Sequence, residues 1–395
     1  MDAHGAEPPE GRRTPPCTRR ARLKIAVIHN LDFDAVPEGD AALRHHEADA
    51  DVVETAHLVA DALSARGHEP RVLAVRDRLD TVLDEIRRCE ADVVFNLVES
   101  LGGDAAQEAA LPRLLERARV PFTGSPARAL RRAHAKDLLR SLLTDRNVRV
   151  APARTLTGAS DLTEGIGAEL RYPLFVKPAR VDGSIGIDQQ SVVESDAQLE
   201  DRVRWLSSRM AGPILVEEYL PGAEINVAVL FGAGQKGTLA VPTTIDFSGF
   251  PSELWPVVTY ACKWQPGSPE YSATSVPLTG QLPGDVTDEA IALSKAVLRA
   301  IGCSGYGRVD LRLDRGGRPC VMDVNPNPDL HPEAGFSLAM RSRGIEYPDL
   351  VERIVLQTRA RRASSRQGQR NAHPRSPAAG PRAPRRAASP GRQLR

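Results

Sequence analysis

In the first third of the chain, two patterns of hydrophobic residues alternate. Short apolar runs of strand length are separated by stretches in which apolar residues recur every three or four positions. The runs predict strands at Leu23–His29, Arg71–Val75 and Val93–Leu97, and the stretches predict helices at Val52–Ala65, Asp80–Arg88 and Gln107–Ala118. Such alternation is typical of an α/β domain on a parallel sheet, which we place at residues 22–125.

A period of two returns near the other end of the chain, between Arg308 and Asn325. Two alternating strands flank a glycine turn at 314–317, which predicts a β-hairpin. Residues two apart project from the same face of a strand. Asp323 and Asn325 therefore share a face, and an antiparallel partner can bring Asp310 beside them.

The side-chain oxygens of Asp310, Asp323 and Asn325 are the ligands that Mg²⁺ prefers, and the ion usually keeps waters and substrate phosphates as well. Arg308 lies two residues from Asp310 on the same face. A cation beside two carboxylates and a metal indicates phosphoryl transfer. The structural alternative is that the Asp-x-Asn sequence only begins an Asx-turn before Pro326.

Lysine is rare in this chain, which makes its positions informative. Six of the 52 basic residues are lysine and the other 46 are arginine. The compact ammonium of lysine is not reproduced by the planar arginine fork. Lys136 opens an apolar-periodic helix, Lys177 ends the apolar strand 174–177, and Lys263 lies in an aromatic segment. Most lysines are solvated surface residues, but the charge of Lys177 beside an apolar strand needs a partner.

A glycine-punctuated loop follows Lys177 and runs to Ile187. Gly183 and Gly186 let backbone N–H groups turn toward an anion, and Ser184 adds a hydroxyl group. An ordinary hairpin loop would use the same residues.

Two further strands are expected, at 214–220 and in the segment 221–229. The first becomes abruptly acidic at its end, so its backbone groups could meet an adenine edge and Glu224 could accept hydrogen bonds from a ribose. A charged hairpin rim is the plainer interpretation.

Both ends of the chain differ in composition from the rest. Residues 1–21 are rich in Pro and Arg without the apolar run of a signal peptide, so we expect a disordered lead. Residues 359–395 hold 11 arginines and no acidic residue, and we expect a disordered tail. Because the whole chain carries +1, residues 1–358 carry −10, which argues against a nucleic-acid enzyme despite the basic tail.

Cysteine spacing and hydropathy exclude further classes. The five cysteines show no C-x-x-C spacing, so neither a zinc site nor a disulfide framework is predicted. No apolar run approaches the roughly 20 residues needed to span a bilayer. We therefore expect a cytoplasmic protein without a membrane partner.

The order of these motifs resembles the ATP-grasp superfamily, and more closely its D-alanine–D-alanine ligase branch, from about residue 22 to 358. The matching motifs are the spacing from Gly124-Ser125 to Lys136, the phrase Val176-Lys177-Pro178, the Glu-x-x-Leu…Gly-x-Glu run at 217–224 and the Gly-x-x-Gly-x-Gly-Arg-Val-Asp stretch at 302–310. The resemblance implies an α/β (α+β) fold. A Rossmann-like domain at 22–125 would precede a central ATP-grasp lobe at 126–210 and a C-terminal lobe at 211–358.

The resemblance also implies a role for each matched residue in binding ATP and Mg²⁺ or Mn²⁺. Those residues are Lys136, Lys177 and Lys263 at the ATP phosphates, Ser184 in a mobile covering loop, Glu217 and Leu220 at adenine, Glu224 at the ribose, Asp310, Asp323 and Asn325 at the metal, and Arg308 at the phosphoryl group and the tetrahedral intermediate. Arg308 and Ser184 would be the catalytic groups. The family usually has glutamate where this chain has Asp323.

The substrate half departs from the family pattern. Asp49 is a loose stand-in for the glutamate of the opening signature, and Glu99 lies in a polar loop after a strand, where open α/β sheets place ligands. Trp264 stands where tyrosine is usual. Asp329 replaces a glycine of the C-terminal motif, and together with Glu333 it would repel a free carboxylate and favour a cationic amine.

These patterns predict an ATP-dependent carboxylate–amine ligase that forms a peptide-type amide through an acylphosphate, from small-molecule substrates, with an acceptor other than D-alanine. The alternatives are a true D-alanine–D-alanine ligase, a natural-product ligase and a nucleotide-binding pseudo-enzyme. A degenerate site usually loses a metal ligand or the arginine, and all four positions are filled here. A homodimer stays open, and a nucleic-acid partner is not expected.

Overall fold

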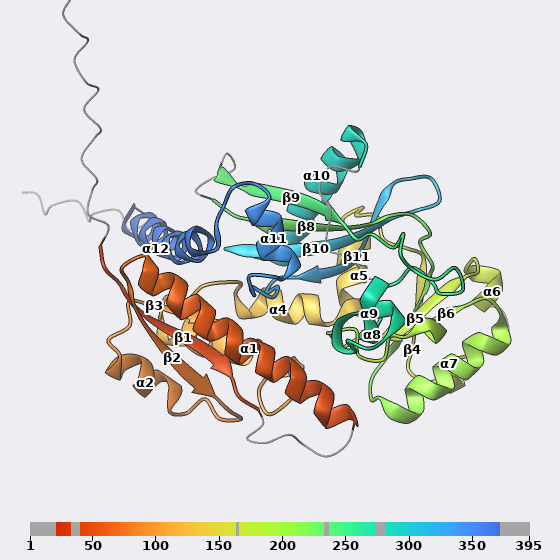
Figure 1. Ribbon diagram of the computed structural model, residues 1–395, viewed down its shortest axis with the longest axis horizontal. Coiled ribbons are helices and arrows are strands. Elements are labelled where there is room, and N and C mark those ends of the chain that lie inside the picture. Colours follow the sequence, from red (N-terminus) through yellow and green to blue (C-terminus); the bar gives the residue numbers. More distant parts are fainter. Residues whose placement is uncertain (1–20, 33–39, 163–165, 233–236, 274–281, 372–395) are drawn as a thin grey trace, which may run out of the picture.

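Three sheets organise the molecule, which is described by a computed structural model over residues 21–32, 40–162, 166–232, 237–273 and 282–371. Their strand orders are β2-β1-β3, β4-β7-β5-β6 and β11-β10-β8-β9 (Figure 1). The strands are β1 (Lys24–Asn30), β2 (Glu69–Val75), β3 (Val93–Asn96), β4 (Ala153–Leu156), β5 (Leu174–Pro178), β6 (Val192–Val193), β7 (Ile214–Glu218), β8 (Glu224–Leu230), β9 (Leu239–Thr244), β10 (Tyr306–Leu313) and β11 (Pro319–Asn325). The helices are α1 (Asp40–Ala65), α2 (Val82–Arg88), α3 (Ala110–Ala118), α4 (Ala127–His134), α5 (Lys136–Thr144), α6 (Ile166–Glu169), α7 (Asp196–Arg209), α8 (Tyr260–Trp264), α9 (Pro269–Ala273), α10 (Gly284–Ile301), α11 (Gly335–Arg341) and α12 (Tyr347–Asn371).

The first sheet is parallel, as the alternation of strands and helices predicts. Val27 in its central strand pairs with Val72 on one side and Phe95 on the other. Helix α1 packs on one face of the sheet, and α2 and α3 pack on the opposite face. Both faces are thus covered, which explains why β1 and β3 read as continuous apolar runs.

The second sheet changes the lobe boundaries expected from the sequence. Strand β7 pairs antiparallel with both β4 and β5, so it belongs with the preceding lobe although it lies after residue 210. Its apolar residues Ile214 and Val216 pack in the same core as Leu206 of α7. Helices α4 and α5, expected in that lobe, pack instead against the third sheet.

The third sheet contains the predicted hairpin. Strands β10 and β11 pair antiparallel, with Arg308 opposite Asn325 and Asp310 opposite Asp323, and the register shifts after Asp310. Helix α10 covers one face of this sheet. Helices α11 and α12 cover the other face, where they share one apolar core with α1 and the first sheet.

The last helix extends into the expected tail. The tail was expected to be disordered from residue 359, but α12 continues to Asn371, so the first part of that segment is helical. Residues 1–20 and 372–395, where the remaining lead and tail predictions fall, lie outside the described residues. Within the described part of the chain, no helix combines the length and the apolar character needed to cross a membrane.

Candidate active site

The hairpin and the neighbouring strand β8 bring four polar side chains into one hydrogen-bonded group around Asp310. Its Oδ1 accepts hydrogen bonds from Arg308 Nε at 2.7 Å and Asn226 Nδ2 at 3.0 Å. Its Oδ2 accepts from Arg308 Nη2 and Asn325 Nδ2, both at 3.0 Å. Asn226 lies opposite Asp310 on β8, and only its polar character in an apolar strand could have indicated it from the sequence.

Asp323 completes this group from the facing strand. Its Oδ1 accepts the backbone N–H of Val324 at 2.9 Å, and its Oδ2 lies 3.7 Å from Lys136 Nζ. Among the described residues no three His, Cys, Asp or Glu side chains converge as a ready-made metal site. The donors that do converge are two carboxylates and the amide of Asn325, an oxygen-only set that fits Mg²⁺ or Mn²⁺ when substrate phosphates and waters supply the other ligands.

Two cations flank this carboxylate pair. Burial disfavours the charge of Arg308, but Asp310 and Asp323 outweigh it and raise the pKa of the guanidinium, which therefore stays charged. Lys263 lies on α8 near the same group. Burial in the cleft and the charge of Arg308 lower the pKa of Lys263, although solvent still reaches its side chain, as expected for an open cleft.

Lys136 joins the hairpin to the glycine loop. Its Nζ donates to the backbone oxygen of Val181 at 3.0 Å and to the carboxylate of Asp182. Asp182 also lies 3.0 Å from His134 Nδ1. Although burial opposes ionisation, Lys136 and His134 hold the pKa of Asp182 well below its usual range. Asp182 was not predicted, since only folding of the loop brings it to a residue 46 positions away.

Lys177 has the partner that its position requires. Its Nζ lies 2.7 Å from Glu217 Oε1, and Arg140 donates to Glu217 Oε2 at 3.0 Å. The carboxylate of Glu217, expected at adenine, is thus held between two cations in this structure. Nearby, Leu220 packs with Ala151, Cys320 and the partly buried Met322, which together form an apolar surface.

Glu224 is also paired, by a residue that the sequence interpretation missed. Arg312 Nη1 lies 3.5 Å from Glu224 Oε2, and Arg312 Nη2 donates to the hydroxyl of Tyr219 at 2.9 Å. Burial raises the pKa of Glu224, and Arg312 opposes that shift. Arg312 lies two residues after Asp310 and therefore near the same face of β10, but the sequence does not indicate its partner, which lies 88 positions earlier.

The glycine loop is held against α8 and the segment before it. Ser184 has a left-handed φ of 60°, and its hydroxyl donates to the backbone oxygen of Val258 at 3.3 Å. Trp264 Nε1 donates to the backbone oxygen of Gly183 at 3.3 Å. Trp264, expected at the substrate, thus contacts the loop that contains Ser184.

Acidic side chains gather at a narrow crevice between the first domain and the segment after β11. Glu99 and Asp329 line it together with the apolar Leu97, Pro328 and Leu330. Burial raises the pKa of Glu99 well above its usual value, and Asp329 adds to that shift. The buried hydroxyl of Thr55 also lines the crevice and has no hydrogen-bond partner among the described residues.

The structure does not place the other predicted substrate residues, Glu333 and Asp49, at this crevice. Glu333 is exposed and lies 3.5 Å from Arg341 Nη2, so the structure does not bring it to the crevice. Asp49 lies on α1, and its side chain is outside the described residues. Asp51 lies two residues later on α1, and burial together with the charge of Asp329 raises its pKa.

Comparison with known proteins places this geometry in a family. The sequence model described as "D-ala D-ala ligase C-terminus" matches residues 146–356. The uncharacterized protein y4sG of Sinorhizobium fredii is 30% identical over 309 residues, which cover 76% of this chain and 86% of that protein. A D-alanine–D-alanine ligase of Anaeromyxobacter dehalogenans is 29% identical over 304 residues, covering 77% of this chain and 90% of that enzyme.

Solved structures agree on the fold. The D-alanine–D-alanine ligase of Bacillus anthracis complexed with ATP superposes with a TM-score of 0.66 at 19% identity, covering 87% of this chain and 99% of that one. The D-alanine–D-alanine ligase of Coxiella burnetii superposes with a TM-score of 0.63 at 18% identity, covering 88% and 98%. The chain therefore belongs to the D-alanine–D-alanine ligase family of ATP-grasp proteins.

Proposed function

We propose that this protein uses ATP to join a carboxylate to an amine through an acylphosphate, and that its acceptor carries a positive charge. The enzyme class, an ATP-dependent carbon–nitrogen ligase, follows from the family. The nature of the acceptor rests on one observation, the pair of carboxylates Glu99 and Asp329 at the crevice.

The bond changes require neutralisation of several negative charges. An oxygen of the donor carboxylate attacks the γ-phosphorus of ATP, and ADP leaves. The acceptor nitrogen then attacks the acyl carbon, the bond to the phosphate oxygen breaks, and the nitrogen loses a proton. Lys136, Lys177 and Lys263 would bind phosphate oxygens, and Arg308 would face the transferred phosphoryl group.

Asp310, Asp323 and Asn325 would hold Mg²⁺, which supplies charge neutralisation at the phosphates when bound. A carboxylate has about four lone-pair positions, and Asp310 already accepts four hydrogen bonds. Binding of a cation at Asp310 would therefore displace one of the side chains that donate hydrogen bonds to it. Arg308 is the donor that could turn to a phosphate, because its guanidinium stays charged whichever anion it faces.

Charge at the crevice supports a cationic acceptor. Burial and neighbouring carboxylates, including Asp329, raise the pKa of Glu99 and so disfavour its charged form, which a cation in the crevice would stabilise. The cavity volume is about 10 Å³, room for one water-sized group such as an ammonium. Asp329 also stands where the family pattern has glycine, so a free carboxylate there would be repelled.

A substrate panel tests this proposal. We expect phosphate release and product mass to show faster turnover with diamines or basic amino acids than with D-alanine as acceptor. Asp329→Asn should raise the KM for the cationic acceptor about tenfold, because one charge-assisted contact is lost. Asp310→Ala serves as the inactive reference, since it removes a proposed metal ligand. Robust D-alanyl-D-alanine formation, with no gain from a cationic acceptor, would contradict the proposal.

A further inference from the structure

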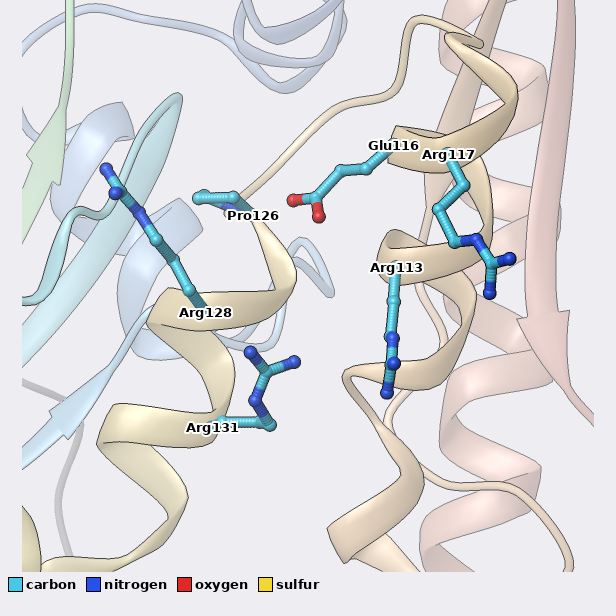
Figure 2. A pocket seen from close by; sticks show the side chains of 6 residues that line it. All are labelled: Arg113, Glu116, Arg117, Pro126, Arg128 and Arg131. Carbon is cyan, nitrogen blue, oxygen red and sulfur yellow. The ribbon is translucent and has the colours of Figure 1, made fainter.

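A second, strongly basic crevice lies between α3 and α4 (Figure 2). Its volume is about 720 Å³, within the range of small-molecule sites. The lining residues are Arg113, Glu116, Arg117, Pro126, Arg128 and Arg131. None of them belongs to the ATP cleft or to the acidic crevice.

The charge of this crevice is not balanced by the protein. It is lined by four guanidinium groups and one carboxylate, and that carboxylate is engaged, because Glu116 Oε1 accepts the backbone N–H of Ala127 at 3.0 Å. In the described part of the chain, no ion pair joins any of the four arginines to an acidic residue. This contrasts with the net charge of −10 on residues 1–358.

Two of the four arginines, one from each helix, lie in the space between the helices (Figure 2). Arg113 and Arg117 are four residues apart on α3, and Arg128 and Arg131 are three apart on α4. Figure 2 shows Arg113 and Arg131 in the space between the two helices, with Arg117 and Arg128 on the outer sides. Two guanidinium groups from different helices therefore flank the middle of the crevice.

The chemistry of these groups selects the ligand. Guanidinium binds phosphate oxygens through paired hydrogen bonds, more strongly than through a single neutral contact. The start of α4 at Pro126 also lines the crevice, but Glu116 already accepts the first N–H of this helix, so the arginines are the groups left for a ligand. The apolar lining that would hold a hydrophobic ligand is limited here to Pro126. The site therefore matches a small, multiply charged anion.

We propose that this crevice is a second anion site, which binds a small molecule through a diphosphate group. It is separate from the site for ATP. Its last lining residue on α4, Arg131, lies five positions before Lys136, which begins the next helix.

Titration of the full-length protein with inorganic pyrophosphate, without nucleotide or Mg²⁺, tests the site in a Lys263→Ala background that weakens phosphate binding in the ATP cleft. We expect calorimetry to show one saturable site in this background, and the added change Arg113→Ala/Arg131→Ala to weaken its affinity tenfold or more. Adding Arg171→Ala/Arg343→Ala instead makes the same charge change at two exposed arginines elsewhere and should leave the affinity unchanged. Equal unfolding temperatures would show that all variants are folded.

Three results would overturn the proposal. One is unchanged pyrophosphate affinity in the Arg113→Ala/Arg131→Ala variant. Another is equally tight binding of citrate, which would mean that charge alone is recognised. The third is a dimer in solution that dissociates on the same double substitution, because the crevice would then hold an acidic surface of a second copy.

Discussion

Glu108 shows how one desolvated carboxyl group can link stability to pH. Burial raises its pKa to about 8, although a hydrogen bond from Asn327 Nδ2 at 3.1 Å opposes the shift. The folded protein thus keeps a proton that the unfolded chain releases above its ordinary pKa of 4.5. The stabilisation from this group is present below pH 4.5 and is lost as the pH rises through 8.

Glu108→Gln should remove this dependence, because glutamine does not titrate but can still accept the hydrogen bond from Asn327. At pH 8 we expect the variant to be more stable than the wild type by about 1–2 kcal/mol, less than the full shift would give since solvent still reaches the side chain. Urea unfolding between pH 5 and 8 measures the difference. Glu346→Gln, at an exposed position, is the control. Parallel pH profiles for the wild type and Glu108→Gln would disprove this linkage.

At single residues, the sequence was informative where one local rule applied. Lys177 follows an apolar strand, so its need for a counter-charge could be predicted, and Glu217 supplies it at 2.7 Å. Neither Asp182 nor Arg312 could be assigned in this way. The contact of Asp182 with Lys136 depends on how a glycine loop folds back, and that of Arg312 with Glu224 on pairing between strands distant in sequence.

At the scale of elements, the glycine loop depends on a close contact at Gly186. Its φ is 76°, and an added Cβ would lie 2.8 Å from Met210 Sδ and 3.0 Å from Pro178 Cγ. Gly344 has nearly the same φ of 74°, but an added Cβ there would have no atom within 4 Å. A comparison of substitutions at these two glycines thus distinguishes the effect of backbone strain from that of steric crowding.

Gly344→Ala should cost about 1 kcal/mol through strain alone, whereas Gly186→Ala should cost about 2–3 kcal/mol because crowding is added. Gly186→Ala should also raise the KM for ATP, since it displaces the loop that carries Ser184 and Asp182. Chemical denaturation and steady-state kinetics measure both effects. Equal costs for the two substitutions, with unchanged KM, would show that the packing of Met210 on the loop has no influence.

The sequence predicts the type of an element better than it predicts which elements pair with it. The hairpin from Arg308 to Asn325 was predictable, because its two strands are joined by a short turn and their register follows from the turn and the alternation. The strand character of 214–218 was equally clear. Its place in the second sheet was not, because its partners β4 and β5 lie 36 or more residues earlier and no local pattern selects between sheets.

At the scale of the whole molecule, one apolar core joins the two ends of the chain. It contains Val27 of β1, Leu63 of α1, Tyr306 of β10, Phe336 of α11 and Val355 of α12. Figure 1 shows α12 next to α1, between the first sheet and the third sheet. The second sheet has a core of its own, which includes Val203 of α7. The first and third sheets should therefore unfold together, and the second sheet should unfold more independently.

Two matched substitutions test this division. Val355 and Val203 are both fully buried, so either Val→Ala change should cost about 2 kcal/mol by leaving a similar cavity. In hydrogen exchange, we expect Val355→Ala to reduce protection in β1, β3 and β8 together, because these strands share its core. Val203→Ala should reduce protection only in β4, β5 and β7. If Val355→Ala affected α12 alone, the shared core would not couple the two sheets, and the acidic crevice between them could open without unfolding either.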